Sequence, residues 1–404
     1  MARQIRIFIE TLILPKLKRH LVKHKKKLQP PFQFKHIAVM KFASLGDYVL
    51  ANHAIKALKL KYTEVRITFI CNSRKNSKIF ENSHYIDNFE YIEVFDERGN
   101  FRHPLNPKFL KDLIVFYLRS WRRQFDILLN LNIIESTFVL LINIIAVYAS
   151  RTKIKIGLDT YDNGFFYDAS IKDNFSGTKA DLYTYLELVS LLGASDHKDS
   201  KNILIPAEVE RNIDSLLNAF MQDRKKSIVC FHPGSNVKIK IWPAMSFAEL
   251  GNSLIKNYGV KILLVGSKKE LGLGEIVTSL FIEEPLNLIG KTTFQELVML
   301  IKKSSLFIGN NSEPMQIAVT EYVPTIGLIG PGLNRYYAYK ERHFRYVKSN
   351  SSCSFVKSKL ECLNINCPTN ECMKSIHVDD VIEMVNQMQK EGVINLNKDG
   401  ERSE

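Results

Sequence analysis

The most constraining feature of the sequence is an alternation of short apolar runs with helical patterns, which occurs twice and is interrupted once. This alternation predicts parallel sheets covered by helices, because the apolar runs suit strands that are buried on both faces. The interruption covers residues 201–226, where we predict a linker followed by a surface helix. The chain has 404 residues, whereas single hydrophobic cores stop growing at roughly 250–300 residues. We therefore predict an α/β protein with two doubly wound, Rossmann-like domains that face a cleft.

The predicted elements follow directly from this pattern. In the first half, strands are expected over residues 36–42, 64–72, 89–96, 124–132 and 153–158, and helices over 48–62 and 138–149. The second half predicts strands over 227–234, 260–267, 286–290, 306–311 and 324–331, and helices over 246–258, 292–304, 313–322 and 378–391. The predicted division is an arm over 1–35, domains over 36–205 and 206–377, and a closing helix with a disordered tail over 378–404.

The positive charge of the chain is concentrated at its N-terminus. Residues 1–27 contain nine Lys and Arg against one Glu, a net +8 of the total +14. Apolar residues precede this basic run, but Arg3, Arg6 and Glu10 interrupt them, which argues against a signal peptide. An amphipathic basic segment on an anionic membrane surface is one interpretation, and a helix packed on the body with a solvated Lys tail is the other. Nucleic-acid binding is not expected, because most of the charge lies in the arm rather than in the cleft.

A membrane-spanning helix is not predicted. The best candidate, residues 138–149, is about 12 residues long, short of the roughly 20 that a span requires. A buried helix is the better interpretation. Together with the cysteine content and the lack of an export signal, this favours a reducing cytoplasm.

The loop over residues 41–50 joins the first predicted strand to a helix. A dinucleotide-binding loop would read G-x-G-x-x-G, but this one contains a single glycine, Gly46. Asp47 follows it, at or near the helix N-terminus. It could act as a general base toward an attacking hydroxyl, or as a helix N-cap, and on position alone we favour the cap.

Two later loops carry groups that suit a phosphorylated ligand. Ser235 and Asn236 follow a strand and offer donors to phosphate oxygens, while Lys238 or Lys240 can neutralise the charge. A surface loop with solvated lysines fits the same residues. Glu270 follows the next strand, where an acid could accept hydrogen bonds from ribose hydroxyls or simply begin a helix.

A fourth loop, with the sequence LFIGNNSEPMQIAV over residues 306–319, joins a strand to a helix. Pro314 suits the first helical turn and Ser312 suits the N-cap. Such a junction is either an ordinary connection or a phosphate site made of backbone amides.

In combination, these loops resemble family 9 glycosyltransferases, the bacterial ADP-heptose:lipopolysaccharide heptosyltransferases. The resemblance covers about residues 36–390 and rests on four motifs in order: SLGDYVLANHAIKALK, HPGSNVKIKIWPAMSFAEL, NLIGKTTFQELVMLIKKSSLFIGNNSEPMQIA and PTIGLIGP. It implies a GT-B fold with an N-terminal acceptor domain and a C-terminal nucleotide-sugar domain. It also implies inverting transfer of a heptose or related sugar, with no metal and no cofactor, to lipopolysaccharide or lipooligosaccharide core or a related surface glycan.

The resemblance also implies roles for particular residues. Asp47 becomes the base, in the loop with Ser44 and Gly46 on the acceptor side, and Lys240 contacts the donor phosphate. The remaining donor-side residues are Ser235, Asn236, Glu270, Asn311, Ser312, Glu313 and Gln316. The expected partners are a nucleotide-sugar donor, a lipid-linked glycan acceptor and, through residues 1–27, the inner face of the cytoplasmic membrane.

The fourth loop departs from the family pattern, which reads Gly-Asn-Asp-Ser-Gly-Pro-Met-His. Here Asn311 replaces Asp, Glu313 replaces Gly and Gln316 replaces His. A carboxylate about 5 Å from a phosphate costs roughly 3 kcal/mol per charge pair at an effective dielectric near 20. Glu313 therefore turns away, pairs with a base such as Lys240, or marks a changed or impaired donor site. A non-catalytic relative that binds a glycan or a partner enzyme is the alternative function.

Four cysteines crowd one segment near the C-terminus: Cys353, Cys362, Cys367 and Cys372. Their spacing is not the paired C-x2-C of zinc sites. We interpret them as a loop clamp or free thiols, with zinc as the lesser alternative.

Overall fold

The computed structural model describes most of the chain and divides it into two compact units. The described residues are 9–23, 25, 28, 32–95, 106–173, 179–195, 203–221, 226–330, 337–349, 351, 367 and 369–396. The first unit comprises residues 1–177 and 181–202, and the second comprises 178–180 and 203–404. The closing helix belongs to the second unit rather than forming a separate segment, because its apolar face completes that unit's core.

The first unit is built on a six-stranded parallel sheet with the order β3-β2-β1-β4-β5-β6. The central strand β1 is buried along its whole length, and its Ile37 lies opposite Ile67 and Ile127. The strands are β1 (His36–Lys41), β2 (Arg66–Cys71), β3 (Asn88–Tyr91), β4 (Ile127–Asn130), β5 (Ile154–Thr160) and β6 (Ala169–Asp173).

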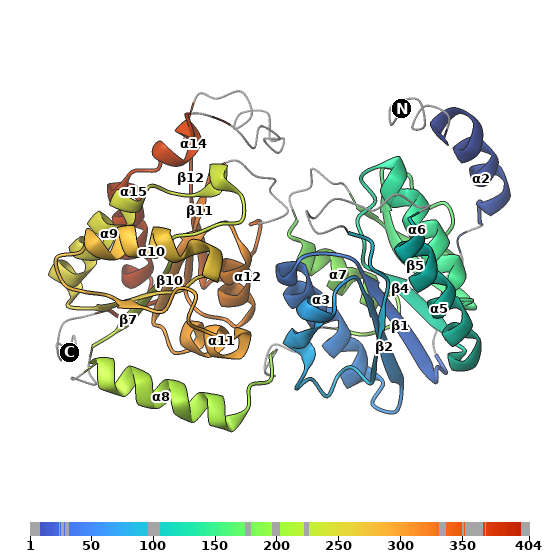
Figure 1. Cartoon of the computed structure of the whole chain (residues 1–404), viewed down its shortest axis with the longest axis horizontal. Helices are drawn as coiled ribbons and strands as arrows, with labels where there is room; N and C mark the ends of the chain where they lie inside the picture. Colours follow the sequence, from blue (N-terminus) through green and yellow to red (C-terminus); the bar gives the residue numbers. More distant parts are fainter. Residues whose placement is uncertain are drawn as a thin grey trace. The chain divides into compact units, whose positions relative to one another are not determined.

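Helices cover both faces of this sheet (Figure 1). One face carries α3 (Leu45–Lys61) and α7 (Asp181–Ser190), which pack together; the other carries α5 (Pro107–Arg123) and α6 (Thr137–Ala149). Short elements α4 (Arg74–Ser77) and η2 (Lys78–Phe80) follow β2. Helix α6 is apolar on all sides and packs into the core, which confirms the prediction of a buried helix. No helix within the described residues is long and apolar enough to cross a membrane.

The second unit repeats the architecture, with the strand order β12-β11-β10-β7-β8-β9. Its strands, all parallel, are β7 (Ile228–His232), β8 (Lys261–Leu264), β9 (Leu286–Asn287), β10 (Leu306–Asn310), β11 (Thr325–Ile329) and β12 (Phe344–Lys348). Its helices are α8 (Ala207–Met221), α9 (Ala244–Tyr258), α10 (Leu271–Ser279), α11 (Phe294–Lys302), α12 (Glu313–Thr320), α14 (Glu371–Lys374) and α15 (Val378–Lys390), with short turns η3 (Lys238–Lys240) and η4 (Lys268–Glu270).

Both sheets reverse their strand order at one point. In the first unit the chain moves outward from β1 through β2 to β3, and then from β4 through β5 to β6. In the second unit the reversal lies between β7 and β10. Ligands of open α/β sheets bind outside the carboxyl ends of the strands at such a switch point. The loops after β1, β4, β7 and β10 are therefore the places to look for a site.

The described part of the N-terminal arm packs on the first unit. It forms η1 (Ile9–Ile13) and α2 (Leu14–Leu21), and Leu14 and Leu21 contact the hydrophobic core. Lys23 then binds the buried carboxylate of Asp168 at 2.9 Å. The packed helix is thus the arrangement found, yet Leu12 and Val22 remain 49% and 60% exposed. Residues 1–8, 24, 26 and 27 of the predicted membrane segment lie outside the described residues.

The two parts of the predicted C-terminal segment, residues 378–404, have different outcomes. Helix α15 lies where the closing helix was predicted. The predicted disorder is wrong for the first residues of the tail, since Leu396 is fully buried in the core; residues 397–404 are outside the described part of the chain.

Each sheet also buries one cysteine. Cys71 ends β2 and Cys230 lies inside β7, and both have free, buried thiols. Burial raises the pKa of the Cys71 thiol to about 12 and raises that of Cys230 as well. Neither thiol is therefore poised for nucleophilic chemistry.

Candidate functional site

A buried asparagine organises the switch point of the second unit. Asn310, the last residue of β10, is fully buried. Its side-chain amide donates to the carbonyls of Pro233 (2.9 Å) and Gly234 (3.0 Å), and its Oδ1 accepts from the backbone N–H of Trp242 (3.1 Å). One side chain thus fixes both ends of the loop between β7 and α9. Asn310 is not among the predicted site residues, although a polar residue at the end of an apolar strand is a signal that identifies such a position.

A second set of contacts joins three loops at the carboxyl edge of the sheet. His232, at the end of β7, is 3% exposed. Its Nδ1 lies 2.9 Å from the Oγ of Ser312, the N-cap residue of α12. Its Nε2 lies 3.4 Å from the Oε1 of Glu270, a residue that follows β8. The other carboxylate oxygen of Glu270 accepts from the backbone N–H (2.5 Å) and the hydroxyl (2.8 Å) of Ser267. The network connects the ends of β7 and β8 to the start of α12.

Glu270 occupies a tightly enclosed position. A Cβ atom on Gly234 would lie 1.9 Å from its Oε1, and one on Gly266 would lie 2.9 Å from its Oε2. Burial acts to raise the pKa of this carboxyl, but the hydrogen bond and charge of His232 and the Ser267 donors outweigh it and hold the pKa at about 2. Both oxygens of the predicted ribose-binding acid already have protein partners, so a ribose hydroxyl would have to share them.

The predicted phosphate loop lies between these anchors. Ser235 is half-buried and its Oγ accepts from the N–H of Val237 at 3.1 Å, while Asn236 is exposed. Lys240 is half-buried at the end of the short turn η3. The indole of the fully buried Trp242 donates to the Ile376 carbonyl at 2.9 Å, which fixes the far end of the loop.

The fourth loop begins α12 as predicted, with Ser312 in the N-cap position and Pro314 in the first turn. The Ser312 hydroxyl does not cap the helix, because it contacts His232 and the Asn310 carbonyl instead. Asn311 is 7% exposed, and its side-chain NH2 has no hydrogen-bond partner among the described residues.

The two substituted positions that follow lie on α12. Glu313 is the first helical residue and is half-buried, and Gln316 is half-buried one turn later. A carboxylate in the first turn interacts favourably with the helix dipole. This explains how the acid is tolerated at a position where the family pattern has glycine.

The first unit presents a different kind of switch point. Ser44 is the N-cap of α3 and Asp47 is its third residue, so the interpretation of Asp47 as the cap is wrong. The Ser44 hydroxyl donates to Asp47 Oδ2 at 2.7 Å, and the Asp47 side chain is half-buried while Gly46 is buried.

Two asparagines hold the loop that leads to Asp47. Asn72, after β2, accepts from the N–H of Ala43 at 2.8 Å, and Asn132, after β4, accepts from the N–H of Phe42 at 2.6 Å. Asn132 is held in turn by Asn130 and Asn143 at 2.7 and 3.0 Å. Neutral amides therefore fix the backbone around this carboxylate.

The predicted residues thus form two groups. Ser44, Gly46 and Asp47 belong to the first unit, and the remaining predicted residues belong to the second. Within the second unit the structure ties Ser312 and Glu270 together through His232. The sequence alone does not distinguish a structural from a functional role for His232, and its contacts here are structural.

Zinc binding, the lesser alternative for the four cysteines, receives no support from the described residues. No cluster of three His, Cys, Asp or Glu side chains suited to a metal ion occurs among the described residues. Cys372 is buried and Cys367 is half-buried, whereas Cys353 and Cys362 lie outside the described residues. The four-cysteine interpretation therefore stays a prediction.

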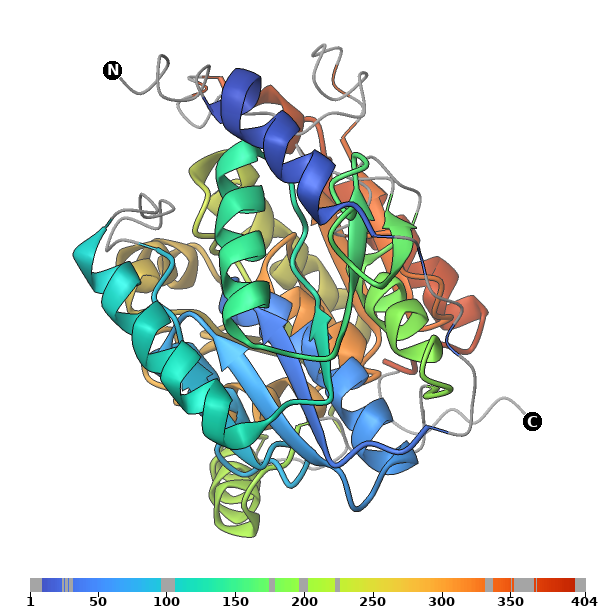
Figure 2. The same cartoon turned by 90° about the vertical axis from the view of Figure 1, so that its right-hand side faces the viewer.

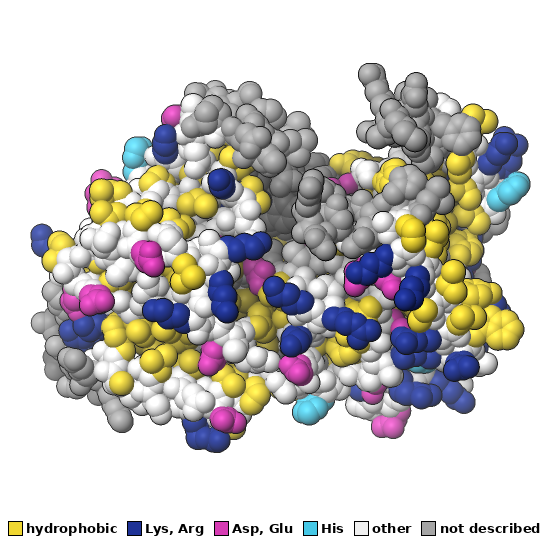
Figure 3. Space-filling model, in the orientation of Figure 1, with side chains coloured by type: hydrophobic (Ala, Val, Ile, Leu, Met, Phe, Trp, Pro, Cys, Tyr) yellow, Lys and Arg dark blue, Asp and Glu magenta, His cyan; other side chains and the backbone are white. Residues whose placement is uncertain are grey.

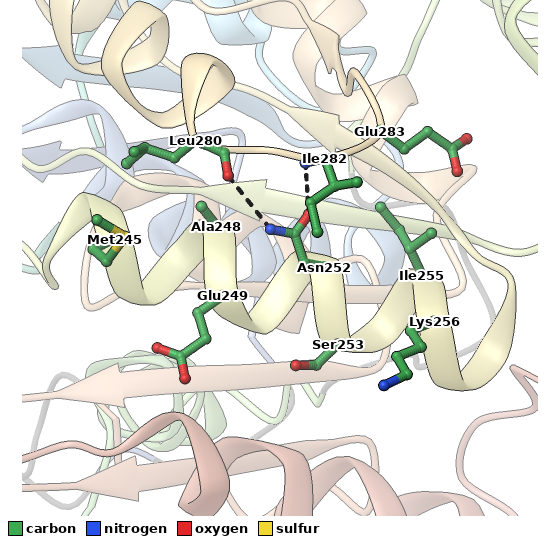
Figure 4. Close-up of a pocket in the computed structure, with 10 residues that line it drawn as sticks. All are labelled: Met245, Ala248, Glu249, Asn252, Ser253, Ile255, Lys256, Leu280, Ile282 and Glu283. Atoms are coloured by element: carbon green, nitrogen blue, oxygen red, sulfur yellow. Dashed lines mark hydrogen bonds between the residues drawn. The ribbon is translucent and has the colours of Figure 1, made fainter.

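A surface hollow of about 570 Å³ lies elsewhere in the second unit (Figure 4). It is formed by α9 and the connection from α10 to β9, and Asn252 holds that connection by accepting from Ile282 N–H at 3.0 Å and donating to the Leu280 carbonyl at 3.4 Å. None of the predicted donor-side residues lines it.

Comparison with known proteins decides the family. Residues 119–369 match the family described as glycosyltransferase family 9 (heptosyltransferase), which is more than half of the chain. The chain belongs to glycosyltransferase family 9. It is a glycosyltransferase of the heptosyltransferase type, in a family that acts in lipopolysaccharide biosynthesis.

Relatives of this family 9 chain agree over most of its length. It is 23% identical to the lipopolysaccharide core heptosyltransferase OpsX of Haemophilus influenzae, over 73% of this chain and 78% of that protein. The crystal structure of a family 9 glycosyl transferase from Veillonella parvula superposes with a TM-score of 0.69 at 20% identity, covering 90% of this chain and 99% of the other. The ADP-heptose lps heptosyltransferase II of E. coli gives 0.60 at 16% identity, covering 88% and 99%. These structures confirm the predicted α/β fold of GT-B type.

Proposed function

We propose that the protein transfers a heptose from ADP-heptose to the core of lipopolysaccharide or lipooligosaccharide or to a related surface glycan, with inversion and without a metal ion. The donor proposal is supported by the similarity to an E. coli protein named for ADP-heptose. The acceptor proposal is supported by a relative named as a lipopolysaccharide core heptosyltransferase.

The observation that carries the mechanism is the position of Asp47. Its carboxylate is half-buried in the first turn of α3, at the carboxyl edge of the sheet, and is oriented by the Ser44 hydroxyl at 2.7 Å. In the proposed step, the acceptor oxygen forms a bond to the anomeric carbon while its proton passes to Asp47. The bond from that carbon to the diphosphate breaks, and ADP leaves with the electron pair. Attack opposite the leaving group inverts the anomeric centre.

The second unit would take the charge that develops on the departing diphosphate. Lys240 brings a positive charge to the loop after β7, and backbone amides of this loop and of the α12 N-terminus add donors. Because His232, Glu270 and Asn310 already fix these loops, little reorganisation is needed when charge moves. Glu313 is the opposing group, and its first-turn position lets the helix dipole offset its charge.

The test separates donor binding from transfer. With purified full-length protein, ADP-heptose should bind in calorimetry, and Asp47→Asn should bind it equally well while transfer to a lipopolysaccharide core acceptor falls by about 10²–10⁴-fold. Ser44→Ala is the matched control and should reduce transfer far less, since it removes a neighbour of the base. Full activity in Asp47→Asn would remove Asp47 from the mechanism, and no binding of ADP-heptose would favour a non-catalytic relative.

We further propose that the protein works in the cytoplasm, at the inner face of the membrane that carries its acceptor. The support is the basic arm, whose net charge over residues 1–27 is +8, together with the exposed Leu12 and Val22 within it.

A further inference from the structure

Helix α5 carries an exposed apolar stripe that the fold does not use. Five large side chains at helical spacing form it: Leu110, Ile114, Tyr117, Leu118 and Trp121. Ile114, Leu118 and Trp121 are each 59% exposed. Figure 3 shows hydrophobic side chains gathered over this side of the first unit, next to Lys and Arg. Such a contiguous patch marks an interaction surface, because single exposed apolar residues are normally scattered.

The opposite side of α5 is firmly anchored, so the stripe is not the result of a loosely docked helix. Phe109 and Phe116 are buried in the core. The buried carboxylate of Glu90 on β3 binds Arg119 at 3.0 Å and Arg123 at 2.9 Å. The Asn106 side chain caps the first turn. A helix held this rigidly presents a defined outer face to its partner.

Basic side chains border the stripe. Lys111 and Arg122 are exposed on the adjoining side of α5. The Arg151 guanidinium lies 4.5 Å from the Trp121 ring centre and donates to the Tyr117 hydroxyl at 3.0 Å. Arg151 therefore places a positive charge over the rings of Tyr117 and Trp121. Tyr and Trp are the residue types that favour the boundary between lipid headgroups and acyl chains.

A basic hollow continues this surface at the C-terminal end of α5. Its volume is about 810 Å³, and its cationic lining residues are Lys35, Lys61, Arg66, Arg122, Arg123 and Lys153. Two acids, Glu64 and Asp126, also line it. Asp126 is already bound by the backbone N–H of Lys35 at 2.8 Å and by the Lys153 ammonium at 3.2 Å. The hollow therefore keeps a net positive charge and suits phosphate groups.

We propose that α5 and this hollow form a docking surface for an anionic phospholipid bilayer. The apolar stripe enters the boundary between headgroups and acyl chains, and the basic border and hollow contact lipid phosphates. This extends, and for the choice of membrane rests on, the proposed function. It also adds a site separate from residues 1–27. Figures 1 and 2 show α2, α5 and α6 on the same side of the first sheet, so the arm helix α2 and helix α5 can both contact one membrane surface.

A bilayer fits these observations better than a second copy of the chain. Two copies joined through α5 would bring the same basic border against itself, and like charges oppose such a contact. An anionic bilayer instead complements the border, the hollow and the apolar stripe together. The oligomeric state of the free protein is accordingly part of the test.

The test is binding of the full chain to vesicles of phosphatidylethanolamine with about one third phosphatidylglycerol, with neutral phosphatidylcholine vesicles as the comparison. The variant Ile114→Ser/Leu118→Ser/Trp121→Ser should weaken binding to the anionic vesicles by at least about tenfold. Lys111→Glu/Arg122→Glu should weaken it too, and more strongly at low salt. The matched control, Leu216→Ser/Ile282→Ser, changes exposed apolar residues of the second unit and should bind as the parent does.

Two further measurements make the result decisive. Trp121 and the fully buried Trp242 are the only tryptophans, so a blue shift of fluorescence on adding vesicles should come from Trp121 and vanish in Trp121→Phe. Transfer to a deacylated, water-soluble acceptor should be unchanged in the triple variant, which separates docking from catalysis. Melting curves should show that every variant is folded.

The outcomes that overturn the proposal are equally defined. Unchanged vesicle binding by the folded triple variant does so, as does loss of binding only when residues 1–13 are removed. A free protein that is dimeric in light scattering, and that the triple substitution makes monomeric, assigns the stripe to a second copy of the chain.

Discussion

The two sheets have the same strand order, yet their switch points are built from different chemistry. In the first unit, neutral amides of Asn72 and Asn132 hold the loop, and the carboxylate beside them has a hydroxyl partner. In the second, a histidine and a carboxylate hold three loops together. Under the proposed function, the neutral amides leave Asp47 to take the acceptor's proton, and the loops that His232 and Glu270 hold together bind the anionic donor. Topology places the site, and the residues that end the strands decide its chemistry.

The largest expected effect comes from separating Glu270 from His232. Gly234→Ala places a Cβ atom 1.9 Å from Glu270 Oε1, so the carboxylate must leave His232. We expect a loss of about 1–3 kcal/mol in the free energy of unfolding, since overpacking of this kind costs that much. ADP binding should fall as well. Denaturant unfolding and calorimetry measure the two effects.

Gly272→Ala is the matched control for this change. Gly272 lies in α10, and a Cβ atom at this position would have open space within 4 Å, so alanine should be neutral or slightly stabilising there. A folded Gly234→Ala variant with parental ADP affinity would show that Glu270 is not needed to shape the donor loop.

A second effect, of similar size, concerns the pH dependence of stability. The pKa of Glu270 is lowered from 4.5 to about 2, so the ionised form stabilises the fold above the unfolded-state pKa. This contribution, on the order of 2–3 kcal/mol, should be lost as pH falls from about 4.5 to about 2. Glu270→Gln should therefore show a shallower fall of stability across that window in urea unfolding. Equal slopes for the two proteins would contradict the assigned contacts of Glu270.

The smallest effect tests the departure in the fourth loop. Glu313→Gln removes a negative charge from the first turn of α12, where the family pattern has glycine. Because the side chain is half-buried and solvent screens its charge, we expect ADP to bind several-fold tighter. This gain in binding free energy is smaller than the electrostatic limit of about 3 kcal/mol. Calorimetry at two salt concentrations measures the change in affinity. Glu321→Gln is not a suitable control, because Lys302 binds Glu321 at 2.7 Å. Glu296→Gln, on α11, is the better comparison, and equal affinities in all three proteins would mean that Glu313 points away from the donor.

Much of the fold was predictable because its central strands are continuous apolar runs. Strands β1 and β10 lie within the predicted ranges since both faces of each are buried. Each sheet, however, has a sixth strand that the pattern did not reveal. Strands β6 and β12 lie at sheet edges and are only partly buried, so their apolar signal is weaker. Helix α5 was also not predicted.

The site was predictable only in part, for a related reason. The sequence pattern placed Asp47 and Lys240 in loops that follow buried strands, and the structure has them there, while their roles stay predictions. It did not reveal Asn310, because a buried amide acts through partners more than 60 residues away. Nor did it show that the Glu270 carboxylate contacts His232 and Ser267, because those contacts depend on Gly234 having no Cβ atom.

The buried thiols of Cys71 and Cys230 give each unit an internal reporter of its own opening. Each thiol lies inside a different sheet, and burial raises the pKa of both, so alkylating reagents can reach them only when the sheet opens. Peptide-resolved labelling of these two residues would time the opening of one unit independently of the other. The labelling rates of the two cysteines would therefore show whether the two units unfold together or independently.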